Sequence, residues 1–178
     1  MRIISGKHKG KKLKSFDGDK IRPTSDKARE ALFSILYNKV IGADFLDLCC
    51  GTGAVGLEAI SRGANLVTFV DSSTSSVKLC EQNLKSIKEN AEIILKDANL
   101  FLKTTDNKFD IIFFDPPYVF DDILSLLKII KDRKILKENA IFIYEHIKDK
   151  PSIKVDGYEL INTKRYGLAV LDFYQQTE

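Results

Sequence analysis

The fold is decided by the stretch Asp47-Leu-Cys-Cys-Gly-Thr-Gly-Ala-Val-Gly56. A short apolar segment, Phe45–Cys50, leads into it, and a helical pattern follows. Gly51, Gly53 and Gly56 match the G-x-G-x-x-G spacing, in which glycines let the backbone turn sharply and approach a ligand closely. The N–H groups at the start of the next helix would face the polar parts of that ligand. The stretch therefore predicts a strand–loop–helix unit that binds a cofactor containing adenosine.

Outward from this loop, short apolar segments alternate with helical patterns. Further strands are expected at Leu66–Val70, Ile93–Leu95, Phe109–Phe114 and Ala140–Tyr144. Their lengths and their polar or glycine boundaries are typical of strands buried on both faces of a parallel sheet. Two last strands, Tyr158–Asn162 and Leu168–Tyr174, with a turn over residues 163–167, predict a closing antiparallel hairpin. The expected fold class is α/β, with a mostly parallel, doubly wound, Rossmann-like sheet.

The amino-terminal region departs from this pattern. Residues 2–5 and 11–14 predict a small basic hairpin, and Pro23-Thr24-Ser25 is a start signal for a helix. Residues 1–29 hold ten basic and three acidic residues, a balance of +7, whereas the rest of the chain has a balance of −4. A polyanionic partner such as nucleic acid would explain this asymmetry, and so would a solvated lysine-rich terminus. We expect an RNA-binding appendage over residues 1–24 and a main domain over residues 25–178.

Composition excludes several classes of protein. Of 178 residues, 44% are hydrophobic and 30% are charged, which is typical of a globular protein rather than a disordered or fibrous one. No apolar run reaches the roughly 18 residues of a membrane span, and no signal-peptide core follows the first residue. The cysteines and histidines lack the spacing of a disulfide framework or a metal site; they are Cys49, Cys50, Cys80, His8 and His146. We expect a cytoplasmic monomer without a membrane segment or a metal.

Three acidic residues, one within a strand and two at or just after strand ends, distinguish between possible cofactors. Asp71 lies 20 residues beyond Gly51, where a carboxylate can accept hydrogen bonds from ribose hydroxyls. Asp47 places negative charge near the loop, which suits the cationic amino group of S-adenosylmethionine and is unfavourable beside the pyrophosphate of NAD. Asp97 lies where an adenine amino group could bind, although it could simply cap the next turn. The pattern favours S-adenosylmethionine.

The most specific motif is Asp115-Pro116-Pro117-Tyr118, at the end of the fourth strand. Open α/β sheets bind ligands at this edge. The prolines fix the backbone and leave carbonyls without local N–H partners, and Tyr118 offers a face on which a base can stack. Asp115 and the Pro116 carbonyl could accept both hydrogens of an exocyclic amine, so that its lone pair faces a methyl group. A rigid turn with a packed tyrosine is the structural alternative.

Together, the glycine loop and this turn resemble class I, S-adenosylmethionine-dependent amino methyltransferases that act on nucleic acids. Four more stretches narrow the resemblance to the bacterial small-subunit (16S) ribosomal RNA guanine-N2 methyltransferase family. They are Arg2–Gly6 with Gly10 and Leu13, Arg22–Thr24 with Asp26 and Arg29–Phe33, Gly56–Ala59 with Ser61–Ala64, and Lys164 with Tyr166-Gly167.

The resemblance implies a role for each motif. Asp71 would hold the cofactor ribose, and Asp97 with Ala98 would bind the adenine. Asp47, Gly51 and Gly53 would surround the methionine part, with further cofactor contacts from Thr24, Cys49, Thr52 and Ser72. The target base would be bound and methylated at Asp115, Pro116, Pro117 and Tyr118. Candidate RNA contacts are Lys7, Lys9, Lys11, Lys12, Lys14, Arg22, Lys164 and Arg165. The chain departs from the family pattern at Cys49-Cys50 and in having Asp71 where glutamate is common.

Other functions remain open at this point. An adenine-N6 methyltransferase of DNA or RNA could use the same turn, because the turn fits any planar amine. A nicotinamide-dependent oxidoreductase would leave the turn unexplained. A catalytically silent RNA-binding assembly factor would not need Asp47, Asp71 and Asp115. The sequence favours methylation of guanine N2 in 16S ribosomal RNA or in the small ribosomal subunit, with the target base flipped out of its stack.

Overall fold

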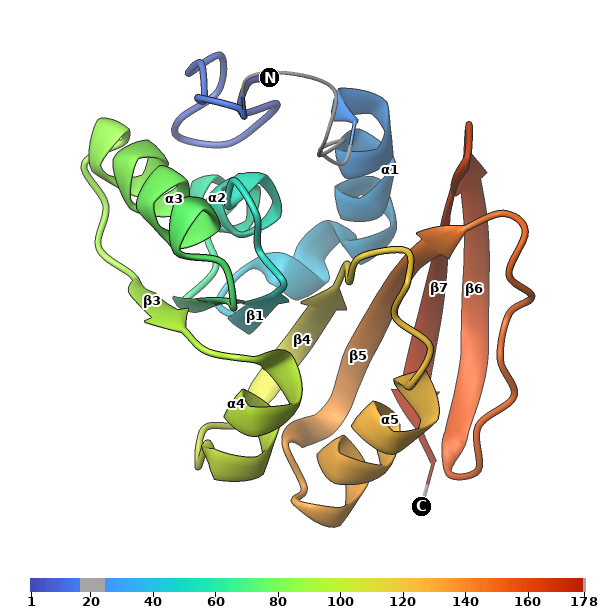
Figure 1. Cartoon of the computed structure of the whole chain (residues 1–178). Coiled ribbons are helices and arrows are strands. Elements are labelled where there is room, and N and C mark those ends of the chain that lie inside the picture. Colours follow the sequence, from blue (N-terminus) through green and yellow to red (C-terminus); the bar gives the residue numbers. More distant parts are fainter. Residues whose placement is uncertain (17–24, 178) are drawn as a thin grey trace.

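The computed structural model describes residues 1–16 and 25–177, which form a seven-stranded sheet with helices on both faces (Figure 1). The strand order is β3-β2-β1-β4-β5-β7-β6, and β7 runs antiparallel to both of its neighbours. The strands are β1 Asp44–Leu48, β2 Leu66–Asp71, β3 Glu92–Leu95, β4 Phe109–Phe114, β5 Leu136–Ile147, β6 Tyr158–Tyr166 and β7 Ala169–Gln176. The fold is the expected class I methyltransferase sheet with a closing antiparallel hairpin.

Helices precede the first strand and connect the parallel strands, and side-chain caps fix where three of these helices begin. The α-helices are α1 Asp26–Leu36, α2 Ala54–Ser61, α3 Thr74–Ser86, α4 Ala98–Thr104 and α5 Ile123–Asp132, and a 3₁₀ helix, η1, covers Tyr37–Val40. Ser25 and Ser73 cap α1 and α3 by accepting from backbone N–H groups three residues on, and Asp97 caps α4 in the same way. Such caps satisfy N–H groups that the helix itself cannot bond.

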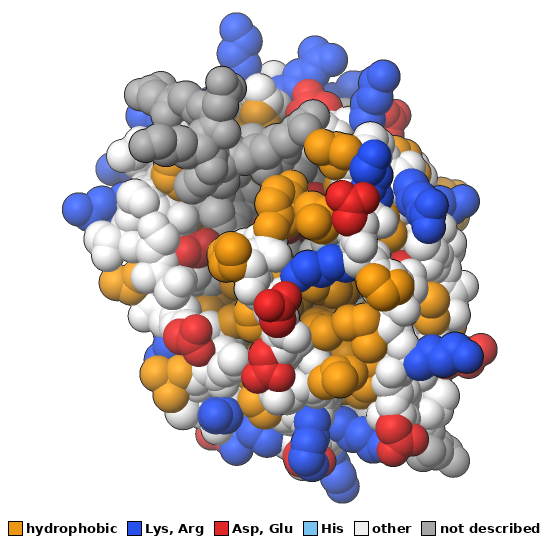
Figure 2. Space-filling view, turned by 45° about the vertical axis from the view of Figure 1, so that its right-hand side comes forward, with side chains coloured by type: hydrophobic (Ala, Val, Ile, Leu, Met, Phe, Trp, Pro, Cys, Tyr) orange, Lys and Arg blue, Asp and Glu red, His pale blue; other side chains and the backbone are white. Residues whose placement is uncertain are grey.

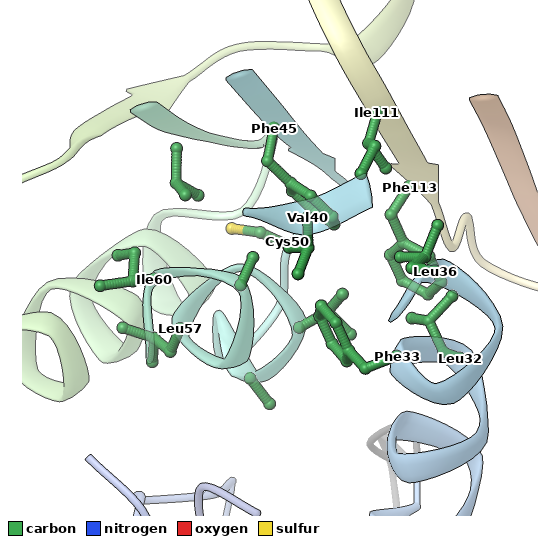
Figure 3. Close-up of a cluster of buried hydrophobic side chains, with 14 of the residues drawn as sticks. Leu32, Phe33, Leu36, Val40, Phe45, Cys50, Leu57, Ile60, Ile111 and Phe113 are labelled. Carbon is green, nitrogen blue, oxygen red and sulfur yellow. The ribbon is translucent and has the colours of Figure 1, made fainter. Parts of the chain in front are cut away.

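The sheet separates two hydrophobic cores, because alternate residues of each buried strand face opposite sides. On one side, α1, α2 and α3 pack against residues such as Phe45, Phe69 and Phe113. Figure 3 shows this cluster, with side chains of α1 and α2 pointing toward β1 and β4. On the other side, α4 and α5 cover residues such as Leu46 and Phe114. Continuous apolar strands therefore correspond to burial on both faces, as expected.

The closing hairpin turns later than its sequence suggests. The turn predicted over residues 163–167 is wrong, because β6 continues to Tyr166 and residues 163–166 stay paired with β7. The Thr163 hydroxyl donates to Asp172 at 2.7 Å and helps to hold this extension in the ladder. Lys164 and Arg165 thus lie in a strand, where neighbouring side chains point to opposite faces of the sheet. They do not lie together in a turn, as the sequence suggested.

The expected hairpin near the amino terminus is reduced to a single bridge between Arg2 and Lys12. Two backbone hydrogen bonds flank the bridge, from the Ile3 N–H to the Lys11 carbonyl at 2.9 Å and from the Leu13 N–H to the Met1 carbonyl at 3.1 Å, and beyond them the chain bonds to helix α2 instead. Ile4 N donates to Glu58 Oε2 at 2.8 Å and Ser5 N donates to Glu58 Oε1 at 3.0 Å. The two segments still lie side by side, but α2 replaces part of the ladder.

Residues 1–16, called the amino-terminal arm below, are docked on the body of the protein. Ser61 of α2 accepts the Lys7 N–H on its carbonyl at 2.8 Å and the His8 N–H on its hydroxyl at 3.0 Å. Gly6 permits this approach, since a Cβ there would lie 1.8 Å from the Ser61 carbonyl oxygen. Ile3 and Leu13 are buried in the same core as α1. The arm is therefore not a solvated tail, although its lysines are exposed.

Candidate active site

Four aspartates meet at the carboxyl edge of the central strands, around the loop that follows β1. Burial raises the pKa of the Cys49 thiol above its ordinary value, and the negative charges of Asp71, Asp115, Asp47 and Asp97 raise it further. Those four charges come from the ends of four different strands or the residues just after them. Cys49 is thus surrounded by the acidic groups that the sequence proposed for the cofactor and the target amine. A thiol in this setting is held protonated and is a poor nucleophile.

Asp71 fixes the glycine loop to the end of β2. Its Oδ2 accepts the Gly51 N–H at 2.9 Å, and its Oδ1 accepts the Ser73 N–H at 2.8 Å. Each carboxylate oxygen can accept a second hydrogen bond, so the group can also receive hydroxyl donors from the partly open side. Ser72, between these contacts, is exposed at the same edge.

Asp47 braces the loop from beneath. Its side chain is almost completely buried, and its Oδ2 accepts the Gly56 N–H in the first turn of α2 at 2.8 Å. Burial, together with the charge of Asp71, outweighs this hydrogen bond and raises the pKa of Asp47 to about 8. The carboxyl group therefore supports the glycine loop by a buried hydrogen bond and is not an exposed ligand.

Within the loop, Gly51 and Thr52 face different surroundings. Gly51 has a φ of +53°, and a Cβ built on it would meet nothing within 4 Å, so the backbone there is open to a ligand. Thr52 is buried, with its hydroxyl 3.9 Å from the Met1 sulfur. The Thr52 carbonyl accepts from Asn83 Nδ2 at 3.0 Å, and the same amide donates to the Lys14 carbonyl at 3.0 Å. The glycine loop and the amino-terminal arm thus share one buried amide.

Asp97 and Ala98 lie beyond β3, at the start of α4. Asp97 Oδ1 accepts the Leu100 N–H at 3.0 Å, so the capping alternative considered for this residue is realised. The side chain is exposed, which leaves its second oxygen accessible from the edge of the sheet. Capping and adenine binding are therefore compatible. Ala98 is half-buried beside it.

The Asp115–Tyr118 turn follows β4 directly and lies next to the glycine loop. Asp115 N donates to the Leu48 carbonyl at 3.3 Å, which ties the turn to the end of β1. Pro116 is buried, whereas Pro117 and Tyr118 are exposed, and 56% of Tyr118 is accessible. A rigid backbone thus presents an aromatic ring and an acid at the rim of the cleft.

On the β5 side, this turn borders a small hollow whose wall contains Tyr144 and His146. The His146 ring stacks on Tyr144 with centroids 5.0 Å apart, and its Nε2 lies 3.0 Å from Asp172 Oδ2. Burial opposes ionisation of Asp172, but hydrogen bonds from His146, Thr163 and Ser152 outweigh it and lower the pKa of that carboxyl. His146 is therefore part of a buried polar network rather than an exposed base, and it holds an aromatic wall in place.

The structure places the candidate RNA contacts in several regions. Five lysines of the amino-terminal arm are exposed, and two of them have local partners. Lys7 Nζ lies 2.7 Å from Glu89, and Lys14 Nζ donates to Gln82 at 3.0 Å. Thr24 and Arg22 fall outside the described residues.

A larger hollow, of about 550 Å³, lies at the opposite edge of the sheet, where the strands begin. Several of its charged groups bind one another: Lys137 Nζ lies 2.6 Å from Asp44, and Lys7 Nζ lies 2.7 Å from Glu89. We therefore assign the chemistry to the carboxyl edge. Within residues 1–16 and 25–177, no group of three or more His, Cys, Asp or Glu side chains is arranged to hold a metal ion. In that same part of the chain, no helix is long and apolar enough to cross a membrane.

Sequence reasoning missed four polar residues that organise the site. Arg29, Glu58 and Asn83 are buried beneath the arm, and Lys150 bonds to the loop after Tyr118. The burial of Arg29 and Glu58 could have been predicted from the sequence, since each is a charged residue within the apolar face of a helix. Lys150 lies in an irregular connection, where no periodicity marks it.

The whole chain has close relatives. The family model described as conserved hypothetical protein 95 matches residues 1–175. Ribosomal RNA small subunit methyltransferase D of Haemophilus influenzae is 34% identical over 180 residues, covering 98% of this chain and 93% of that protein. The putative rRNA methyltransferase YlbH of Bacillus subtilis is 33% identical and covers 99% of both chains. Among solved structures, the putative methyltransferase yhhF from Escherichia coli has a TM-score of 0.89 and 31% identity, covering 99% of this chain and 98% of that one.

The buried Asp47 predicts an unusual dependence of stability on pH. Its pKa rises from 3.8 to about 8 on folding. The contribution of this shift to the free energy of unfolding is therefore complete below pH 3.8 and is lost as the pH rises toward 8. Asp47→Asn keeps an acceptor for the Gly56 N–H but cannot ionise. Relative to this variant, the wild-type protein should lose up to about 1.4 kcal/mol of unfolding free energy per pH unit between pH 5 and 8.

Urea denaturation at several pH values, without cofactor, measures this difference. Asp122→Asn, at an exposed position, is the matched control and should follow the wild-type protein. Parallel stability curves for wild type and Asp47→Asn would show that Asp47 keeps an ordinary pKa in the folded protein.

Proposed function

Because the chain belongs to the family described as conserved hypothetical protein 95, we propose that it transfers a methyl group from S-adenosylmethionine to guanine N2 in 16S ribosomal RNA. The observation that carries this proposal is the position of Asp115-Pro116-Pro117-Tyr118. The turn follows β4, which pairs with β1. Asp115, assigned to the target amine, therefore lies near the acids assigned to the cofactor, which surround Cys49 with it. The names of the relatives, which include small-subunit ribosomal RNA methyltransferases, support the choice of RNA.

The residues present at the carboxyl edge fit S-adenosylmethionine. The cofactor would supply an electrophilic methyl group on a positively charged sulfur. Several carboxyl groups around Cys49 favour a cationic ligand, whereas the same charges would repel a pyrophosphate. The open backbone at Gly51 gives the ligand room, and Asp71 can accept from ribose hydroxyls while it holds the loop. Asp97 and Ala98 would border the adenine.

The Asp115 turn would orient the acceptor amine. An exocyclic NH₂ that donates one hydrogen to Asp115 and the other to the Pro116 carbonyl has its lone pair directed away from both acceptors. Tyr118 is exposed enough to stack on the base, which must leave its own stack to reach the turn. Alignment of the amine with the methyl group, rather than acid–base catalysis, would supply most of the acceleration.

The amino-terminal arm is suited to dock RNA. Lys9, Lys11 and Lys12 are exposed on an arm held in place by α2 and α3. On the face shown in Figure 2, basic side chains lie mostly around the rim, while hydrophobic and acidic side chains occupy the middle. Basic groups around the rim of this face would attract RNA phosphates. Small-subunit ribosomal RNA, alone or in the assembled particle, is the substrate that we infer.

The function is tested by analysing nucleosides of 16S ribosomal RNA methylated in vitro with purified protein. The wild-type protein should produce N2-methylguanosine, and Asp115→Ala should lower the single-turnover rate at least a hundredfold, because the acceptor of the target amine is gone. Cofactor affinity of this variant, measured by calorimetry, should stay within about threefold of wild type, since Asp115 is assigned to the base.

Asp122→Ala removes an exposed acid from the same connection, whose side chain makes no capping hydrogen bond to α5, and is the control. If N6-methyladenosine appears instead, the enzyme is an adenine methyltransferase. If nothing is methylated while cofactor still binds, a silent assembly factor becomes the better explanation. Near wild-type methylation by Asp115→Ala would remove Asp115 from the mechanism.

Replacing Lys9, Lys11 and Lys12 together with Gln tests RNA docking by the arm. If all three bind phosphates, the slope of log affinity against log salt should become shallower by about 0.7–0.9 for each lysine–phosphate pair that the substitutions remove. The melting temperature should hold, since these side chains have no part in docking the arm.

Lys103, Lys128 and Lys134 are exposed lysines in or next to α4 and α5, which lie away from the arm (Figure 1). Their triple replacement with Gln is the matched control and should leave the slope unchanged. Equal slopes for both triple variants would mean that the arm does not bind RNA phosphates.

A further inference from the structure

The segment after the Asp115 turn, residues 116–122, is neither helix nor strand, yet it carries the aromatic ring proposed to stack on the base. Phe120 N donates to the Pro117 carbonyl at 2.8 Å and closes a tight turn. The Phe120 ring packs edge-on against Phe114 of β4, with centroids 5.2 Å apart. One side of this turn is thus anchored to the sheet by an apolar contact, and its other side faces the connection between β5 and β6.

Lys150, in that connection, binds the turn with its whole ammonium group. Its Nζ donates to the Tyr118 carbonyl at 3.0 Å, to the Phe120 carbonyl at 2.9 Å and to Asp121 Oδ1 at 3.0 Å. An ammonium has three N–H donors, so this set of acceptors uses all of them. The Lys150 side chain is only 31% exposed, unlike a lysine that is free in solvent.

The backbone of Lys150 is itself attached to the sheet. Its N–H donates to the Ile147 carbonyl at 3.1 Å, at the last residue of β5, and the neighbouring Lys148 N–H donates to the Leu168 carbonyl at 2.9 Å. Lys150 therefore links the end of β5, through its backbone, to the turn that carries Tyr118, through its ammonium group. Lys150 also lines the hollow that Pro116, Tyr118 and Tyr144 border.

We propose that Lys150 is a positioning residue of the methyltransferase, which fixes Tyr118 at the height and angle needed to stack on the flipped target base. The proposal rests on the proposed function, because it takes the Asp115 turn as the base site. Lys150 acts through the backbone of the turn, since its donors bind the carbonyls of Tyr118 and Phe120. It fixes the ring and leaves the cofactor side of the cleft unchanged.

The chain contains no tryptophan, so Tyr118→Trp creates a single fluorescent reporter on the turn. In this background, Lys150→Met should lower the steady-state anisotropy of the tryptophan and increase its quenching by acrylamide, because the turn loses its polar anchor. Lys150→Arg, which can still donate to two carbonyls, should restore most of the anisotropy. Lys148→Met, at an exposed neighbour, is the matched control and should change neither quantity.

In the wild-type background, Lys150→Met should lower kcat/KM for RNA tenfold to a hundredfold, the range expected when a reactant is misplaced by a fraction of an ångström to one ångström. Its affinity for S-adenosylmethionine and its melting temperature should stay close to wild type, and Lys150→Arg should recover most of the activity. Unchanged anisotropy and unchanged kcat/KM in Lys150→Met would overturn the proposal. If Lys150→Met lowers the tryptophan anisotropy but the wild-type protein methylates a base other than guanine, the positioning role of Lys150 stands and guanine is rejected as the target base.

Discussion

The gathering of carboxyl groups around one loop is the constraint on which the carboxyl edge of this sheet depends. Four acids meet there, and backbone N–H groups of the glycine loop and of the following helices bind three of them; the acids are Asp47, Asp71, Asp97 and Asp115. These hydrogen bonds hold the loop in shape and stabilise the negative charge of ionised carboxylates. The ionised acids would attract a cationic ligand, which is why the cleft suits a sulfonium cofactor better than a phosphate.

The same loop also depends on buried groups behind it. Arg29, fully buried in α1, donates from Nη2 to the Arg2 carbonyl at 2.8 Å and from Nη1 to the Ala54 carbonyl at 3.4 Å. The Asn83 side-chain amide donates to the carbonyls of both Lys14 and Thr52 and so joins the arm to the glycine loop. Because buried polar groups are costly to leave unpaired, these contacts specify one docked arrangement of the amino-terminal arm. The surface proposed to bind RNA and the loop proposed to bind cofactor are thus parts of one packed unit.

Sequence periodicity predicted most of the fold, because each parallel strand is an apolar run between polar boundaries, and the start signal that contains Ser25, the cap of α1, was recognisable. The resemblance to this methyltransferase family is confirmed by similarity along residues 1–175. The hairpin turn was misplaced because residues 163–166 are polar yet pair fully with β7. The contact of Lys150 with the Tyr118 turn depends on tertiary geometry between distant segments, which no local pattern encodes.

The central claim is that the acidic carboxyl edge is the cofactor site, with Asp71 as the ribose acceptor. Titration calorimetry of S-adenosylmethionine with Asp71→Ala tests it most directly, with Asp122→Ala as a control at an exposed acid. Hydrogen bonds to a charged group contribute about 1.5–3 kcal/mol, so affinity should fall about tenfold or more in Asp71→Ala. The control should bind like the wild-type protein. Wild-type affinity in a folded Asp71→Ala variant would contradict the account.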